Sequence, residues 1–319
     1  MSFSGRVKEE LSRQYSPARH CRIAELAAII SMCGNVCISS REKYTLKIRT
    51  ENLAVARKCF TLLKKTFNIE TDIAVRRNRA RGSETYYIII RSHEDTLRVL
   101  QAVKLIDCHG EVVEELSLVR NVVIQENCCK RAFLRGAFLA SGSMSDPEKS
   151  YHFEIVCTAE GKAVQLQNLI QAFGLEAKVV LRKKTWVVYL KEGGQIVDIL
   201  NIMEAHVALM ELENIRILKD MRNTVNRKVN CETANINKTV SAAVKQIEDI
   251  RFLQATTGLE KLPDGLKDMA LTRLEYPDAT LKELGELLTP PVGKSGVNHR
   301  LRKLGEMADA VRAKQGGTI

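Results

Sequence analysis

Apolar and polar residues alternate along several short segments in the first two hundred positions of the chain. In one of them, Tyr44, Leu46 and Ile48 fall on one face of an extended chain and Lys47 and Arg49 on the other. A period of two is typical of a strand that covers a core with one face only. Runs with helical periodicity separate these strands, so the pattern predicts a mixed α and β structure.

The same order of elements occurs twice. Two helices of small and apolar residues, at 24–34 and 133–142, each end in a glycine that can cap a helix. After each helix the pattern predicts a strand, a helix, two strands and a further helix, at 44–49, 53–67, 71–76, 84–91 and 94–106 and again at 151–157, 162–173, 176–181, 185–190 and 195–203. We therefore predict an α+β fold of two tandem αββαββα repeats, each with a four-stranded antiparallel sheet, of which the segments above are three strands, and with helices on one face. The two small-residue helices are predicted to form the shared interface.

This repeat resembles the LAGLIDADG homing-endonuclease fold, in which each motif helix ends in an acidic residue that holds a catalytic metal ion. The motif, laid on 26–34 and 134–142, places Cys33 and Ser141 at the two acidic positions. Mg²⁺ requires hard anionic oxygens, and two-metal hydrolysis requires them on both sides of the scissile phosphate. Asp146 follows the second motif, but nothing matches it in the first repeat. We therefore predict that the nuclease chemistry is absent, that the chain is not an enzyme, and that the helix pair is a packing interface.

Residues from about 201 to 255 have a helical pattern with no strand, and they are rich in asparagine and basic residues. Asparagine is a poor helix former, so one interpretation is that asparagines cap a helix break near Cys231 and bridge two domains. In the other interpretation, Asn223, Arg227 and Asn230 share one helix face and contact phosphates or bases. We favour the first. The predicted domains are 1–205 (repeats at about 20–106 and 128–204), a basic linker at 206–257, and 258–319.

The last predicted domain has the pattern of a helix-turn-helix. Pro263 suits the first turn of a helix that Pro277 ends. Thr280 and Glu283 form a capping box for a second helix, and Ser295 can cap a third helix that runs to about residue 310.

The third helix separates an apolar face from a basic face. Its apolar positions, which must pack on the other two helices, are Val297, Leu301, Leu304 and Ala308. In the major groove asparagine pairs well with adenine and arginine with guanine, so we predict base-reading residues on the opposite face: Ser295, Asn298, His299 and Arg302. Flanking basic residues are predicted to contact phosphates: Lys294, Arg300 and Lys303. The alternative is a basic, solvated helix in a bundle that does not bind DNA.

The charge of the whole chain adds support for a nucleic-acid partner. A net charge of +11 indicates a polyanion, nucleic acid before an acidic membrane surface. Accessory DNA contacts are predicted in a basic loop and in the linker, at Arg76, Arg77, Arg79, Arg81, Arg222, Asn223, Asn226, Arg227 and Lys228. Solvated hairpin tips are often charged, so the role of the loop at 76–81 stays open.

The nine cysteines are scattered, and none has CxxC or zinc-site spacing along the sequence. We therefore expect reduced thiols that pack as small hydrophobes, with no metal and no cofactor. Neither a signal peptide nor an apolar run near the ~18 residues of a membrane span is visible. The expected location is cytoplasmic and nucleoid-associated, without a membrane partner.

Taken over its whole length, the sequence resembles the WhiA family of regulators from Gram-positive bacteria. The residues that carry the resemblance are SFS at 2–4, VKEEL at 7–11, FLRGAFLASGS at 133–143, NCETAN at 230–235, QIEDI at 246–250 and SGVNHRLRKL at 295–304. The resemblance implies a degenerate LAGLIDADG-like domain joined to a helix-turn-helix that is similar to the promoter-reading domain of sigma factors.

The resemblance further implies a sequence-specific transcriptional regulator linked to cell division, chromosome segregation and sporulation. Its partners would be double-stranded DNA in promoter regions, and RNA polymerase or a second regulator. Two alternatives remain: a nucleoid or division scaffold with incidental DNA binding, and an active homing endonuclease, which Cys33 and Ser141 disfavour.

Overall fold

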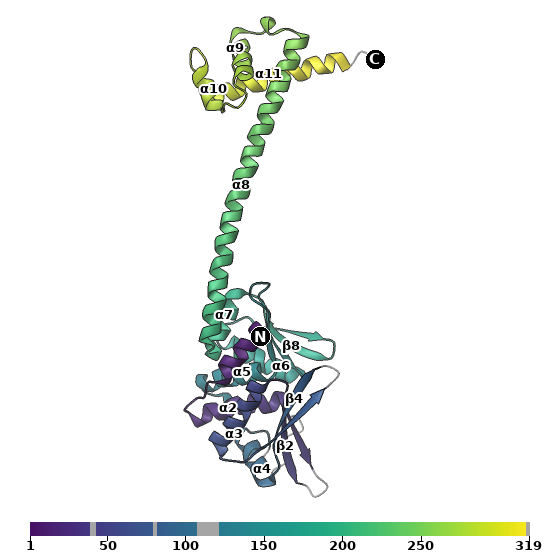
Figure 1. Ribbon diagram of the computed structural model, residues 1–319, viewed down its shortest axis with the longest axis vertical. Coiled ribbons are helices and arrows are strands. Elements are labelled where there is room, and N and C mark those ends of the chain that lie inside the picture. The colour runs from purple at the N-terminus through teal and green to yellow at the C-terminus, as the bar shows by residue number, and fades with distance from the viewer. Residues whose placement is uncertain (39–42, 79–81, 107–120, 317–319) are drawn as a thin grey trace. The chain divides into compact units, whose positions relative to one another are not determined.

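The computed structural model describes residues 1–38, 43–78, 82–106 and 121–316. The chain divides into two compact units, Met1–Lys219 and Asp220–Ile319, which are drawn with their elements labelled in Figure 1. The domain boundaries at 205 and 257 that the sequence suggested stay a prediction. Across the described residues, no helix combines the length and the apolar character that crossing a membrane requires.

The N-terminal unit begins with helix α1 (Phe3–Ser12) and continues with two copies of the same arrangement. The first copy contains α2 (Arg19–Cys33), β1 (Gly34–Ile38), β2 (Tyr44–Thr50), α3 (Leu53–Phe67), β3 (Asp72–Asn78), β4 (Ser83–Ile90) and α4 (His93–Ala102). The second contains the short 3₁₀ helix η1 (Asn121–Ile124), α5 (Asn127–Ser141), β5 (Gly142–Met144), β6 (Phe153–Cys157), α6 (Glu160–Gln171), β7 (Lys178–Arg182), β8 (Thr185–Leu190) and α7 (Gly193–Met203).

Each copy forms a four-stranded antiparallel sheet, with the order β1-β2-β4-β3 in the first and β5-β6-β8-β7 in the second. The predicted fold class and tandem repeat are confirmed. The first strand of each sheet was not located from the sequence, because it begins at the glycine that ends the preceding helix. Gly34 and Gly142 have extended backbones, with φ of −78° and −79°, so the chain passes directly from helix to strand.

Helices α2 and α5 pack against each other at the centre of the unit, as predicted. A Cβ atom on Gly136 would lie 2.4 Å from the carbonyl oxygen of Glu25 and 3.0 Å from the Cβ of Ala28, so only glycine permits this close approach. The sheets cover the helices with their apolar faces. Leu46 and Ile48 are buried there, in agreement with the alternation in the sequence.

A group of charged side chains is buried beside this helix pair. Lys58 Nζ lies 2.6 Å from Glu25 Oε1, and Arg135 Nε lies 3.1 Å from the same oxygen. Glu25 and Lys58 are 0% exposed and Arg135 is 3% exposed. Arg135 Nη1 also contacts Glu204 Oε2 at 2.7 Å, and Lys58 Nζ donates to the carbonyl oxygen of Leu11 at 2.7 Å. The charges therefore compensate one another inside the core, which is the condition under which buried ions are tolerated.

Helix α8 (His206–Thr256) is continuous through the asparagine-rich segment. The predicted helix break near Cys231 is therefore wrong. The low helix propensity of asparagine amounts to only a few tenths of a kcal/mol per residue, which neighbouring good helix formers offset.

The C-terminal unit contains the last part of α8, a short 3₁₀ helix η2 (Leu259–Lys261), α9 (Asp264–Glu275), α10 (Leu281–Leu287) and α11 (Lys294–Gly316). Its core includes Ile250 and Leu253 from α8. Arg312 Nη1 on α11 lies 2.7 Å from Asp249 Oδ1, which attaches the end of α8 to the bundle.

The caps of this bundle agree in part with the sequence interpretation. The capping box of Thr280 and Glu283 is confirmed. Pro263 lies just before α9 as its N-cap residue. Ser295 does not cap α11 but lies within its first turn, because the helix begins one residue earlier, and α11 continues beyond the predicted end near residue 310.

Candidate nucleic-acid interface

Helix α11 presents the two faces that the sequence predicted. Val297, Leu301, Leu304 and Ala308 are all buried in the core of the C-terminal unit. The proposed base-reading residues are all exposed, namely Ser295, Asn298, His299 and Arg302. Because packing holds one face of the helix, its orientation within the bundle is fixed, and the polar face stays available.

The connection between α10 and α11 is tight. The backbone N–H of Val292 donates to the carbonyl oxygen of Gly285 at 2.9 Å. A Cβ atom on Gly285 would lie only 2.0 Å from the carbonyl oxygen of Val292, so no larger residue fits without a shift of the backbone. The glycine thus allows the turn to fold back onto α10, and this sets where α11 begins.

The basic residues of α11 differ in their exposure to solvent and in their contacts. Lys294 and Lys303 are exposed. Arg300 is half-buried, and its guanidinium carbon lies 3.4 Å from the place of a Cβ on Gly265, over the start of α9. Arg302 Nε lies 3.4 Å from Glu306 Oε1, but both side chains are more than half exposed. An ion pair so open to water is weak, so it leaves Arg302 able to exchange partners.

The accessory positions lie in both units. Arg76 and Arg77 are exposed on β3, and Arg77 Nε donates to Glu84 Oε1 at 2.8 Å, which offsets part of its charge. Arg79 and Arg81 lie outside the described residues. The remaining positions are all exposed on α8: Arg222, Asn223, Asn226, Arg227 and Lys228.

Helix α8 has a polar side and an apolar side in this region. Asn223, Arg227 and Asn230 share one face, because they are spaced by four and three residues on a continuous helix. Exposed apolar side chains recur at helical spacing on the other side: Met221, Val225, Val229, Ile236 and Val240. If this segment contacts a nucleic acid, its polar side chains must share one face of the helix, and they do.

The two positions at which the nuclease motif would carry an acid lie at the ends of α2 and α5. Cys33 and Ser141 line one surface hollow, together with Lys8 and Arg49. Burial raises the pKa of Cys33 to about 11, so its thiol is neutral. Among the described residues that line this hollow, Glu51 is the one with a carboxylate. Its side chain is exposed, and its Oε1 lies 3.8 Å from Arg49 Nη2. A pair of acidic oxygens placed for two metal ions is not found in this hollow.

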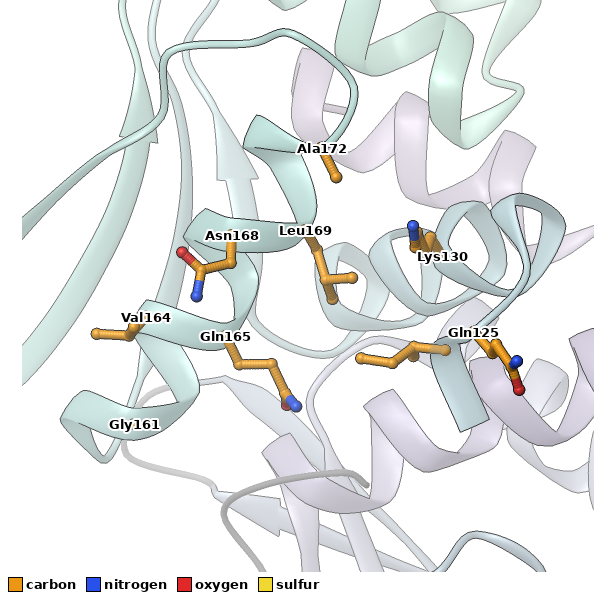
Figure 2. A pocket seen from close by; sticks show the side chains of 9 residues that line it. Gln125, Lys130, Gly161, Val164, Gln165, Asn168, Leu169 and Ala172 are labelled. Carbon is orange, nitrogen blue, oxygen red and sulfur yellow. The ribbon is translucent and has the colours of Figure 1, made fainter. Parts of the chain in front are cut away.

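A second hollow of about 670 Å³ lies between η1, α5 and α6 (Figure 2). Lys130 and Gln125 line it on one side, and Gln165 and Leu169 of α6 line it on the other. Among the described residues of its lining, Lys130 is the charged side chain, and the others are apolar, amide or glycine. The described residues that line this hollow therefore do not include a general acid placed beside a base or a nucleophile.

One group of reactive side chains was missed by the sequence analysis. His20 and Cys21 on α2 and Cys128 and Cys129 on α5 place their ring nitrogen and sulfur atoms within 4.8 Å of one another. Each pair is only a dipeptide, and a long stretch of chain separates the two. The one signal in the sequence is that the offset between Gly34 and Gly142 also separates His20 from Cys128 and Cys21 from Cys129.

Comparison with known proteins gives matches along most of the chain. Residues 19–106 match the WhiA N-terminal LAGLIDADG-like domain, 130–222 match the WhiA LAGLIDADG-like domain, and 225–308 match the WhiA C-terminal HTH domain. A protein of Lachnoclostridium phytofermentans named "Probable cell division protein WhiA" is 55% identical over 98% of this chain and 100% of its own length. A protein of the same name from Alkaliphilus oremlandii is 51% identical over 97% of each chain.

A solved structure shares the fold. The crystal structure of full-length DUF199/WhiA from Thermatoga maritima superposes with a TM-score of 0.60 and covers 97% of this chain and 99% of its own, at 24% sequence identity.

Proposed function

The chain belongs to the WhiA family, as its sequence motifs suggested, and we propose that it is a sequence-specific DNA-binding regulator that reads the major groove with α11. The observation that carries the proposal is the division of α11 into a buried apolar face and an exposed face with Asn298, His299 and Arg302. Insertion of such a helix into the major groove, with its N-terminal residues on base edges, is the docking mode of helix-turn-helix proteins.

Each polar residue has a distinct role in this proposal. Asn298 reads adenine and Arg302 reads guanine, since these pairs can form two hydrogen bonds each. Ser295 and His299 read neighbouring bases. Lys294 and Lys303 contact phosphates, and Arg300 does so from its position over α9. The exposed basic residues of α8 supply further phosphate contacts.

The regulatory setting is proposed from the family. Relatives are named as probable cell division proteins, and we propose that this chain controls genes for division and chromosome segregation, and for sporulation where the organism sporulates. The proposed partners are promoter DNA and RNA polymerase or a second regulator, and the proposed location is the nucleoid. We also propose that the chain is not a nuclease, because Cys33 and Ser141 stand where the fold would need acids.

The test begins with genome-wide mapping of the DNA that the protein binds, which defines a preferred site. Affinity for a duplex with that site is then compared between the wild type, Asn298→Ala and Arg302→Ala. Each substitution is expected to cost about 1–3 kcal/mol and to relax discrimination at one base pair. Lys282→Ala, an exposed position on α10, serves as the charge-matched control for Arg302→Ala and is expected to keep the sequence preference.

Two results would contradict the proposal. Equal affinity of Arg302→Ala and wild type for the preferred site would remove α11 from the interface. Equal affinity of the wild type for the preferred site and a scrambled duplex would favour the scaffold alternative instead.

A further inference from the structure

We propose that His20, Cys21, Cys128 and Cys129 form a tetrahedral Zn²⁺ site that joins the N-terminal ends of α2 and α5. The four donor atoms lie within 4.8 Å of one another. His20 Nδ1 lies 3.1 Å from Cys129 Sγ and 3.4 Å from Cys21 Sγ, so one ring nitrogen points into the group of thiols. Two ligands come from each helix, and each pair comes from adjacent residues.

The donor set is one that zinc uses in structural sites. Zn²⁺ is held by cysteine sulfur at about 2.3 Å and by histidine nitrogen at about 2.0–2.1 Å, and Cys₃His is one of its usual structural sets. In a tetrahedron with these bond lengths, neighbouring donors are roughly 3.5–3.8 Å apart. The donors here therefore need to close by about 1 Å at most. Ca²⁺ and Mg²⁺ require oxygen ligands, and this group offers none.

The burial of the ligands suits a structural site. Cys21 and Cys129 are buried against the helix pair, whereas His20 and Cys128 are exposed. An ion can thus enter from the solvent side and be covered from the protein side. Four protein ligands leave no open position for water or substrate, and closed sites of this kind stabilise a fold rather than catalyse a reaction.

The internal repeat supplies an independent argument. His20 and Cys128 occupy equivalent positions in the two copies, as do Cys21 and Cys129, because the offset is the one that relates Gly34 to Gly142. The two helices pack against each other, and Gly136 lies against its equivalent, Ala28, so equivalent positions of the two helices face one another. The site is at the opposite ends of α2 and α5 from Cys33 and Ser141, and it is therefore distinct from the metal positions of the nuclease fold.

The first experiment measures metal content in the full-length protein. Protein purified under reducing conditions without chelator is analysed for zinc and iron by mass spectrometry, and the metal-free protein is titrated with Co²⁺. We expect one zinc per chain, and visible absorption bands of tetrahedral, thiolate-bound Co²⁺ that zinc abolishes.

The variants are His20→Ala combined with Cys128→Ser, since both residues are exposed and their loss removes no buried packing. The matched controls are Cys37→Ser and Cys231→Ser, two exposed cysteines outside the group. We expect the double variant to lose the zinc and the Co²⁺ bands and the controls to keep both. Removal of zinc is expected to lower the Tm of the N-terminal unit by roughly 5–10 °C, as measured by the fluorescence of Trp186.

Several results would overturn the proposal. These are a reduced wild-type protein that binds neither zinc nor Co²⁺, a double variant that retains the metal, and an iron–sulfur chromophore in place of zinc. Peptide mapping that finds a disulfide among Cys21, Cys128 and Cys129 in protein purified with no metal would overturn it as well. A Tm that does not respond to removal of a bound ion would overturn the inference that the ion joins the helices.

Discussion

The two units of this protein use charged residues in opposite ways. In the N-terminal unit, Glu25, Lys58 and Arg135 are sealed in the core and compensate one another. In the C-terminal unit most basic side chains of α11 face solvent. Among the described residues of this unit, Asp249 and Arg273 are also buried, but Asp249 pairs with a partly exposed arginine and Arg273 donates to a backbone carbonyl. The larger N-terminal core surrounds a whole group of charges, whereas the smaller C-terminal core holds charges singly.

The comparison shows why a net charge of +11 says little about where a polyanion binds. A basic residue contributes to binding only if its charge is exposed and not already matched. Lys58 and Arg135 count toward the total but cannot reach a ligand. The net charge therefore does not identify the DNA-binding part, and that assignment rests on the exposed polar face of α11.

The largest effect is expected from Glu25→Gln. This change leaves Lys58 and Arg135 buried without their shared counter-charge, which costs about 3–5 kcal/mol. Trp186 is the single tryptophan of the chain and lies on β8, so its fluorescence during urea unfolding reports on the N-terminal unit alone.

The matched control for this prediction is Glu9→Gln, which removes a partly exposed partner of the exposed Arg13 and is expected to change stability very little. If Glu25→Gln unfolds at the same urea concentration as Glu9→Gln, the buried charges do not hold the N-terminal unit together, and the contrast between the units disappears.

A smaller effect, in the other unit, is expected from Gly285→Ala. The added Cβ would meet the carbonyl oxygen of Val292, so the turn before α11 must shift, at about 1–3 kcal/mol. Helical circular dichroism should show an earlier transition of the C-terminal unit, while the Trp186 transition stays in place.

Gly265→Ala is the control in the same unit. Its Cβ would make only an ordinary contact of 3.4 Å with Arg300, so the substitution is expected to be neutral or to stabilise α9 by up to about 1 kcal/mol. Loss of stability in Gly265→Ala equal to that in Gly285→Ala would show that the tight turn is not the cause.

The salt dependence of DNA binding gives a finer test of the contrast. Replacing Arg222, Arg227 and Lys228 together by alanine is expected to lower the slope of log K against log salt by about 0.9 for each phosphate that these side chains neutralise, without changing the preferred sequence. The same replacement of residues 182–184, an equal charge in the N-terminal unit, is expected to leave the slope nearly unchanged. Equal reductions of the slope in the two variants would place both units on the DNA backbone.

The last pair of substitutions is expected to have no effect on DNA cleavage. Cys33→Asp combined with Ser141→Asp places an acid at each position that the nuclease fold would use. We expect neither the wild type nor this variant to nick plasmid DNA with Mg²⁺, since the hollow also holds the basic side chains of Lys8 and Arg49. Reproducible cleavage by the pure wild type that a chelator abolishes would show that the chain is an enzyme.

Sequence patterns that span only a few residues predicted much of this architecture. The alternation at Tyr44–Ile48 and the capping box at Thr280 lie within a few residues, and both were interpreted correctly. The predicted break in α8 was wrong because the low helix propensity of asparagine is weak, whereas the helical pattern continues through the whole segment. Ile250 and Leu253 lie before the predicted start of the C-terminal domain at 258, yet they pack in its core, a contact that no local pattern reveals.

The residues around Cys33 determine what an acidic side chain at that position would do. The charges of Lys8 and Lys162 act to lower the pKa of the Cys33 thiol, against the larger effect of burial. Lys162 Nζ also donates to the carbonyl oxygen of Ser31, which lies on α2 with Cys33. An acid placed at position 33 would lie beside these ammonium groups and would form an ion pair with them. A carboxylate at position 33 would therefore act as a counter-ion for neighbouring lysines, so a single acidic substitution there would not by itself create a metal site.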